Sequence, residues 1–149
     1  MKLKLIKNSK KIDFYSVSTE TKMELPLVGE SIRAGFPSPA DDFLDITIDL
    51  NKELIKHPAS TFFGRVNGDS MKDIGIDDGD LLVIDKSLNP DDGKIAVCFI
   101  DGEFTLKQIK TDKDCIWLMP ANEKYQPIKV TSDSDFVVWG IVIHVIKSF

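Results

Sequence analysis

A serine and a lysine that stand 37 positions apart are the residues of this chain best suited to chemistry. Ser70 lies in the turn sequence Gly68-Asp69-Ser70-Met71, and Lys107 ends the sequence Glu103-Phe104-Thr105-Leu106-Lys107 on an expected strand. A neutral lysine can take the proton of a serine hydroxyl, so the pair predicts a nucleophile and its general base without a histidine. The backbone amides of Ser70 and Asp69 are candidates for the donors that would stabilise a developing oxyanion.

The strand that carries Lys107 is expected to form a hairpin with the strand before it. Asp101-Gly102 between two apolar stretches is typical of a two-residue type I′ loop. In this register Lys107 lies opposite Ala96 and shares a face with Thr105 and Cys98. Small and apolar neighbours exclude water, which lowers the pKa of a lysine because the ammonium loses its hydration. A shift from about 10.4 to about 7–8 corresponds to about 3–5 kcal/mol.

The N-terminal part differs from the rest of the chain in charge and pattern. Residues 1–22 contain six lysines against Asp13 and Glu20, a balance of +4, so the remainder must carry −9 to give the net charge of −5. Residues 1–30 show no sustained helical period and are expected to be an arm with one or two short strands. The arm either lies on the acidic body or is a solvated tail. The segment around Ala34 could reach the serine, in which case the chain would carry a peptidase and its own substrate.

Size and composition favour one folded domain of a cytoplasmic protein. The chain has 149 residues, of which 42% are hydrophobic, and this suffices for an ordinary core. Cys98 and Cys115 lack the spacing of metal ligands, so they are expected to be reduced, buried thiols. There is no apolar stretch of about 20 residues and no signal-peptide pattern. The acidic body argues against broad binding to duplex DNA, and no cofactor motif is present.

From residue 44 onward the pattern predicts strands separated by turns. Residues 44–50 alternate between apolar and polar side chains, as a half-buried strand does, and residues 51–57 are expected to form one helical turn that Pro58 ends. Further strands are expected at residues 61–66, 81–84, 95–100, 103–109, 116–119, 128–131 and 136–146, with turns at residues 77–80 and 89–93. The predicted fold is mostly β, with compact barrel-like sheets, short helical turns and an extended N-terminal arm.

Other catalytic arrangements find less support in the sequence. The Ser-x-x-Lys pattern of penicillin-binding enzymes is absent because Asp73 stands where that lysine would be. His57, beside Pro58, and His144, in an apolar stretch, are the only histidines. A Ser-His-Asp triad is possible in principle, but neither histidine has a suggestive context. A serine in such a turn often only caps a helix or stabilises the turn, and a lysine on a strand is often exposed to solvent. Spacing alone therefore does not decide whether Ser70 and Lys107 form a catalytic pair.

Several motifs, taken in order and spacing, resemble those of one family. They are Gly35-Phe36-Pro37-Ser38-Pro39-Ala40, Gly68-Asp69-Ser70-Met71, Asp78-Gly79-Asp80-Leu81, Asp101-Gly102-Glu103-Phe104-Thr105-Leu106-Lys107, Leu118-Met119-Pro120-Ala121-Asn122 with Tyr125 and Pro127-Ile128, and Trp139-Gly140-Ile141-Val142-Ile143-His144. From about residue 25 to its end the chain is similar to the LexA-like self-cleaving serine peptidases (peptidase family S24). Within them it resembles the UmuD-like subunits of SOS translesion DNA polymerase V. The N-terminal segment of this chain, its first 20 or so residues, is longer and richer in lysine than is expected for this family.

The resemblance implies a fold and a site. The fold would be the LexA/UmuD-type peptidase fold, with Ser70 as nucleophile and Lys107 as general base. The cleaved bond would be Ala34–Gly35, so that residues 1–34 are an N-terminal arm removed by self-cleavage and residues 35–149 are the peptidase and polymerase-accessory domain. Small side chains at this bond would let an extended segment lie close to the serine, as a strand added to a sheet edge. No cofactor and no metal are implied.

Partners are implied by the same resemblance. A RecA-type recombinase filament on single-stranded DNA would stimulate cleavage as a coprotease. The shortened form would be a homodimer that joins a UmuC-like Y-family DNA polymerase in translesion synthesis, with no membrane and no direct sequence-specific DNA binding. The alternatives are a non-cleaving interaction module of the same fold, a LexA-type repressor peptidase domain and a membrane signal peptidase. The lack of a DNA-reading part opposes the repressor, and the lack of a transmembrane anchor opposes the signal peptidase.

Overall fold

The computed structural model describes residues 2–7, 11–22, 24–27, 46–68, 72–100, 102–120, 126–131 and 136–149. Most of these residues lie in strands, which confirms the predicted mostly β fold. The strands are β1 (Lys2–Lys7), β2 (Ile12–Ser18), β3 (Glu24–Leu27), β4 (Ile46–Asp49), β5 (Thr61–Val66), β6 (Leu81–Asp85), β7 (Ile95–Ile100), β8 (Glu103–Asp112), β9 (Cys115–Met119), β10 (Ile128–Val130) and β11 (Phe136–Ile146). The short helical segments in this part of the chain are α1 (Leu50–Leu54) and the 3-10 turns η2 (Pro58–Ser60) and η3 (Lys72–Ile74).

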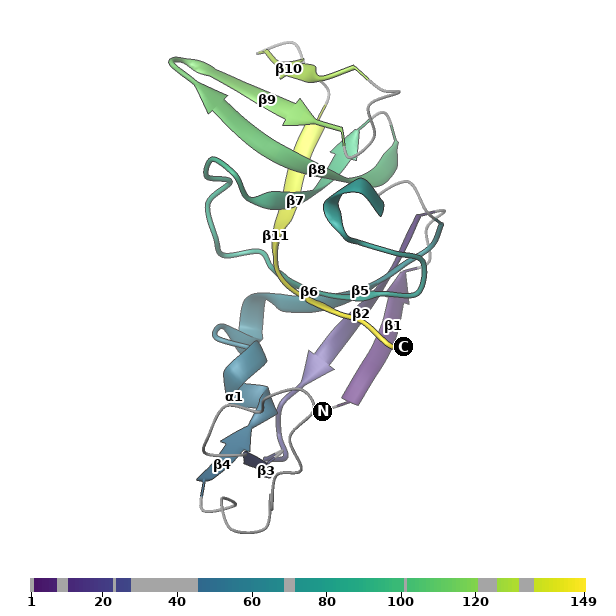
Figure 1. Ribbon diagram of the computed structural model, residues 1–149, viewed down its shortest axis with the longest axis vertical. Helices are drawn as coiled ribbons and strands as arrows, with labels where there is room; N and C mark the ends of the chain where they lie inside the picture. The colour runs from purple at the N-terminus through teal and green to yellow at the C-terminus, as the bar shows by residue number, and fades with distance from the viewer. Residues whose placement is uncertain are drawn as a thin grey trace, which may run out of the picture.

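Nine of the strands form one sheet, in the order β1-β2-β5-β6-β11-β7-β8-β9-β10, and β3 pairs with β4 in a second sheet. The large sheet has two parts, with β7 to β10 in the upper part of the view and β1, β2, β5 and β6 in the lower part (Figure 1). The long strand β11 passes through both. It pairs with β7 through Phe136–Val142 and with β6 through Ile141–Ile146. β11 therefore joins the two parts into one body.

The course of β11 depends on irregular pairing and on a glycine. Its register shifts between Val138 and Gly140 and again between Val142 and His144, and such bulges bend a strand. Gly140 lies where β11 passes close to β6. A Cβ atom at this position would lie 2.6 Å from Cγ2 of Ile84, closer than two carbon atoms can approach. The bend therefore requires a residue without a side chain at this point.

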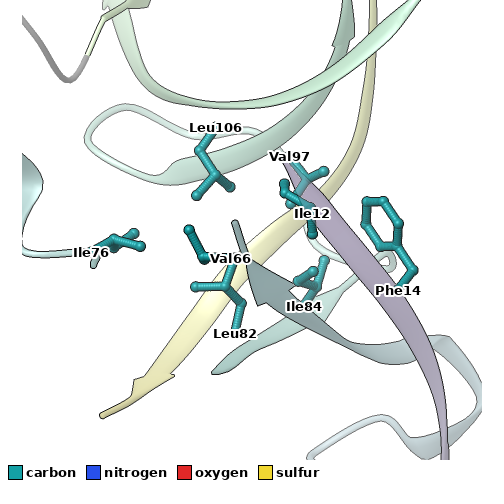
Figure 2. Close-up of a cluster of buried hydrophobic side chains, with 8 residues drawn as sticks. All are labelled: Ile12, Phe14, Val66, Ile76, Leu82, Ile84, Val97 and Leu106. Carbon is teal, nitrogen blue, oxygen red and sulfur yellow. The ribbon is translucent and has the colours of Figure 1, made fainter. Parts of the chain in front are cut away.

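The largest cluster of buried side chains joins the two parts of the sheet. Its members come from β2, β5, β6, β7, β8 and the turn before β6: Ile12, Phe14, Val66, Ile76, Leu82, Ile84, Val97 and Leu106 (Figure 2). A second cluster lies between β7, β8, β9 and β11, and a third contains Ile55, Phe63 and Val83 near α1. Full burial of one such side chain contributes about 1.5–3 kcal/mol to folding. These clusters hold the strands that carry the candidate site.

The first described strands belong to the body of the protein. β2 lies between β1 and β5, and its residues Ile12 to Ser16 pair with Val66 to Phe62. Ile12 and Phe14 are each 1% exposed. Of the two alternatives that the sequence left open for this part, residues 11–18 therefore pack on the body and are not a solvated tail.

The second sheet precedes α1. β3 pairs with β4 from Glu24 opposite Asp49 to Leu27 opposite Ile46. Asp49 then caps α1, since its carboxylate accepts a hydrogen bond of 3.0 Å from the amide of Asn51. The predicted strand was to continue through Leu50, but the cap ends it one residue earlier. Residues 44 and 45 of that prediction lie outside the described residues.

The remaining predicted elements are largely confirmed. β5 and β11 have the predicted bounds. The helical turn expected at residues 51–57 is shorter, because α1 ends at Leu54 with Ile55 as its C-cap, and Pro58 does not end it but begins η2. β8 continues beyond residue 109 to Asp112, because it also pairs with β9 from Gln108 opposite Met119 to Asp112 opposite Cys115. None of the described helices has the length and apolar character needed to cross a lipid bilayer.

Candidate functional site

Lys107 lies in the middle of β8, in the hairpin register that the sequence predicted. Ala96 is its cross-strand partner, and Thr105 lies opposite Cys98. Ala96 and Cys98 are fully buried, and Thr105 is almost fully buried. The side chain of Lys107 is half-buried among these small neighbours. Its amine is therefore partly withdrawn from water.

The surroundings of Lys107 favour its neutral form. Burial lowers the pKa of Lys107 below the ordinary value of a lysine, and the positive charge of Lys11 lowers it further. A thiolate at Cys98 would act in the opposite direction. Burial raises the pKa of the Cys98 thiol to about 12, however, so this group is uncharged in the working range and exerts no such effect. Lys107 thus loses its proton more readily than an exposed lysine, as the role of general base requires.

The turn at residues 77–80 supports the end of β5, just before the segment that contains Ser70. The amide of Val66 donates to the carbonyl of Asp80 (2.9 Å), and the amide of Gly79 donates to the carbonyl of Val66 (2.8 Å). The amide of Gly68 donates to Oδ1 of Asp78 at 2.7 Å. Gly68 has a φ of +91°, a conformation that strains other residues. Gly68, Asp78 and Asp80 therefore together determine the backbone conformation at the end of β5.

A lysine near the C-terminus holds the same turn in place. Lys147 donates from Nζ to the carboxylate of Asp80 and to Oδ2 of Asp77, the latter at 2.8 Å. Burial by itself would raise the pKa of Asp80, but the amide of Asp77 and the ammonium of Lys147 outweigh it and lower the pKa. The buried carboxylate of Asp80 is therefore ionised and paired, and it fixes the turn beneath Gly68.

Lys11 connects the end of β5 with Lys107. Its carbonyl accepts a hydrogen bond of 2.7 Å from the amide of Asn67, and its ammonium is close enough to act on the pKa of Lys107. Val66 directly precedes Asn67, and Leu106 directly precedes Lys107. These two apolar side chains belong to the same buried cluster (Figure 2). The end of β5 and the centre of β8 therefore lie in the same part of the molecule, although they are far apart in sequence.

The other predicted site residues lie outside the described part of the chain. They are Ser70 and Asp69, and Ala34 and Gly35 of the predicted scissile bond. Their roles stay predictions. Directly after the segment that contains Ser70, Lys72–Ile74 form the 3-10 turn η3. Gly68 and Lys72 are thus the described neighbours of the predicted nucleophile.

A second polar cluster surrounds Asp85, and no sequence motif predicted it. His57 Nδ1 lies 2.6 Å from Oδ2 of Asp85. Oδ1 of Asp85 accepts from the hydroxyls of Ser87 (2.6 Å) and Ser60 (3.0 Å) and from the amide of Ser87 (2.8 Å). In the sequence, His57 had no suggestive functional context. Its partner Asp85 ends β6, and only the fold brings the two together.

This second cluster does not have the geometry of a Ser-His-Asp triad. Ser87 Oγ lies 3.3 Å from Nδ1 of His57, which is also the nitrogen next to Asp85. In a triad the serine and the aspartate bind opposite nitrogens of the imidazole. The other histidine, His144, lies on β11 opposite Val83. The described residues therefore offer no alternative to the Ser-Lys pair, and the His57 cluster has the arrangement of a structural clamp.

Replacing Asp85 with asparagine is expected to destabilise the fold by about 2 kcal/mol at neutral pH. Burial alone would raise the pKa of Asp85, but the hydrogen bonds from Ser87, His57 and Ser60 outweigh it and lower the pKa from 3.8 to about 2. A lowered pKa of this size corresponds to about 2 kcal/mol at about 1.36 kcal/mol per unit. This stabilisation is present above the unfolded pKa and is lost as the pH falls through about 2.

Urea denaturation of both chains at several pH values measures this effect. The difference in unfolding free energy should be constant near pH 7 and should shrink towards pH 2, where the wild type has lost its contribution. Asp114→Asn is the matched control, because this side chain is exposed in the turn between β8 and β9. Equal stability of the Asp85→Asn and Asp114→Asn chains at pH 7 would contradict the clamp.

The described residues contain no group of three or more His, Cys, Asp or Glu side chains that could hold a metal ion. Cys98 and Cys115 are both free. Cys98 is buried as predicted, whereas Cys115 is only partly buried because it begins β9 next to a turn.

Comparison with known proteins places the chain in a family. A family model described as Peptidase S24-like matches residues 26–143. Protein SamA of Salmonella typhimurium strain LT2 is 43% identical over 123 residues, which cover 83% of this chain and 87% of SamA. Protein MucA of Escherichia coli is 37% identical over 137 residues, which cover 90% of this chain and 92% of MucA. The LexA repressor of Alcanivorax borkumensis is 41% identical over 124 residues, 83% of this chain but 59% of the repressor.

These matches agree with the motifs and with the mostly β fold that carries them. The family model covers both the strand that bears Lys107 and the segment that contains Ser70. The chain therefore belongs to the S24-like peptidase family, the self-cleaving serine peptidases that its sequence resembles.

Proposed function

We propose that this peptidase cuts its own Ala34–Gly35 bond with Ser70 and Lys107, and that residues 35–149 then serve as a subunit in SOS mutagenic translesion synthesis. The observation that carries the catalytic part is Lys107 itself, a half-buried lysine on an interior strand of the sheet, whose pKa is lowered by burial and by Lys11. The near full-length matches to SamA and MucA support a role like theirs, because only 59% of the LexA repressor is matched.

In the proposed reaction the neutral amine of Lys107 takes the proton of Ser70 Oγ, and this oxygen bonds to the carbonyl carbon of Ala34. The amides of Ser70 and Asp69 would donate to the oxygen that becomes negative. The bond to the nitrogen of Gly35 then breaks, and the lysine gives its proton to the leaving amine. A water that loses a proton to the same lysine hydrolyses the resulting ester. One water is consumed for one peptide bond.

The β3–β4 ladder supports cleavage within one chain. Leu27 lies opposite Ile46, so the ladder holds both ends of the segment 28–45, which contains the predicted bond. A segment held in the same chain as the site can react without an encounter between two molecules.

The proposal is tested by incubating the purified chain over a range of pH and weighing the products by intact mass spectrometry. Fragments 1–34 and 35–149 are expected, more rapidly at alkaline pH and with a recombinase filament on single-stranded DNA. The same incubation of Ser70→Ala should leave the chain whole. A wild-type chain that stays intact at every pH, also with the filament, would support the alternative of a non-cleaving interaction module.

The partners form the finer part of this proposal. They are a recombinase filament as coprotease, a second copy of the shortened chain and a Y-family DNA polymerase, all in the cytoplasm. Two free thiols support a reducing compartment. Exposed apolar side chains on β11, such as Val137 and Ile146, provide area for protein contacts. Sedimentation of the cut protein, alone and with the polymerase, measures both associations.

A further inference from the structure

The segment that self-cleavage would detach contains an interior strand of the large sheet. We refer to residues 1–34 as the leader. Within it, β2 lies between β1 and β5, and its register with β5 extends from Ile12 opposite Val66 to Ser16 opposite Phe62. An interior strand satisfies its backbone groups on both edges, which is not how a detachable tail is bound.

Both faces of β2 are packed. On one face, Ile12 and Phe14 are 1% exposed and belong to the largest buried cluster (Figure 2). The ring of Phe14 lies 4.7 Å from that of Phe104 and 4.8 Å from that of Trp139, measured between centroids. On the other face, Tyr15 and Val17 pack against the cluster near α1. The leader therefore contributes apolar side chains to two buried clusters of the remaining chain.

The surface that receives β2 is shaped for it. Gly64 on β5 lies opposite Phe14, and a Cβ atom at Gly64 would approach Cγ2 of Ile12 to 3.0 Å. The absence of a side chain at this position lets the leader lie close to β5. The amide of Asn67 donates to the carbonyl of Lys11 (2.7 Å), and Asn51 Nδ2 donates to the carbonyl of Thr21 (2.5 Å). Contacts therefore continue along the leader beyond β2.

The proposed cut lies in a loop whose two ends remain paired. β3 belongs to the leader and β4 to the remaining chain, and Leu27 lies opposite Ile46. Hydrolysis between residues 34 and 35 removes none of the pairs in β3–β4 or β2–β5. After the cut, β2 and β3 of the leader still pair with β5 and β4 of the body, and β1 stays paired with β2.

We propose that the edge of β5, with the apolar side chains around it, is a docking site for residues 11–18 of the same chain, and that the leader stays bound there after cleavage. Release of the leader is then a second step, separate from the chemistry. It uncovers the edge of β5 and the ring of Trp139. Docking of the leader on β5 does not depend on which residues catalyse the cut. The idea that release of the leader controls the cut protein rests on the proposed function.

The test uses the full chain with Ser70→Ala, so that any cut comes from an added protease. A recognition sequence for a site-specific protease replaces residues 29–33, and the cut protein is passed over a sizing column and weighed by native mass spectrometry. Both fragments are expected in one peak with the summed mass, and concentrated guanidinium chloride should separate them. A leader that elutes alone while the remainder keeps its circular dichroism spectrum would overturn the proposal.

Two further measurements keep the test independent of folding defects. In the cut protein with the wild-type leader sequence, hydrogen exchange at the amides of β5 should be as slow as in the uncut chain; exchange at the rate of exposed amides would count against docking. A labelled synthetic leader should replace the bound one faster in a Phe14→Ala chain than in the Leu5→Ala control, where an exposed side chain of β1 is shortened. Because the added protease makes the cut, leader loss and failure of self-cleavage are distinguishable results.

Discussion

Replacing Lys107 with methionine is expected to slow self-cleavage by about 10²–10⁴-fold, the usual contribution of a general base. The methionine keeps the length and apolar stem of the side chain but cannot take the proton of Ser70. The stability of the fold should not decrease. Because burial lowers the pKa of Lys107, its protonated form is less favourable in the folded state than in the unfolded one near neutral pH. Methionine removes that cost, so the melting temperature should stay the same or rise.

The pH dependence of cleavage gives the same prediction a second readout. In the wild type the logarithm of the rate should rise with pH while Lys107 is mostly protonated, and it should level off above the pKa of this lysine. Since the pKa of Lys107 is lowered, the plateau of the rate begins at a lower pH than it would with an exposed lysine as the base. Lys11→Gln removes a positive charge near Lys107 and should therefore move the profile to higher pH.

Lys110→Met is the matched control, because Lys110 is exposed on the same strand and faces the other side of the sheet. It should leave both the rate and the pH profile unchanged. Intact mass measured over time, with thermal unfolding of each variant, checks all of these expectations. Wild-type cleavage by the Lys107→Met chain would show that another group is the base.

Replacing Phe14 with alanine is expected to lower the free energy of unfolding of the intact chain by about 3–5 kcal/mol. Phe14 is 1% exposed, and its ring packs against the rings of Phe104 and Trp139. Truncation leaves a cavity between β2, β8 and β11 that the bent sheet cannot close. Since domains of this kind are stable by about 5–15 kcal/mol, the variant should lose a large part of its stability.

Leu5→Ala provides the comparison within the leader. Leu5 is 46% exposed on β1, so its truncation should change stability by less than about 1 kcal/mol. Urea denaturation followed by tryptophan fluorescence measures both, because Trp139 reports directly on the ring cluster. If Phe14→Ala were as stable as Leu5→Ala, the leader would be a tail and the docking proposal would lose its main support.

Local sequence patterns predicted the elements that carry the candidate base. The Asp101-Gly102 loop set the hairpin register, and the structure pairs Lys107 with Ala96 as expected. This succeeds because a two-residue turn fixes the pairing of its neighbours, and alternation along a strand then fixes the faces. The bounds of β5 and β11 followed from apolar runs between turn residues in the same way.

Local patterns were less informative where a side chain competes with the backbone. Leu50 fits the alternation of a strand, yet the carboxylate of Asp49 accepts the amide of Asn51 and starts a helix there. The N-terminal part looked like an arm because its lysines and serines hide the short apolar pattern of β2. The resemblance to a family added the roles of Ser70 and the Ala34–Gly35 bond.

What the sequence determined by itself is therefore the strands from β4 to β11, the face on which Lys107 lies and the family to which the chain belongs. Only the tertiary structure decided that Lys11 lies near Lys107, that His57 meets Asp85 and that β2 is an interior strand. The physical reason is the range of the interactions. Turns and alternation act over a few residues, whereas these contacts join segments whose pairing depends on how all the apolar faces are buried together.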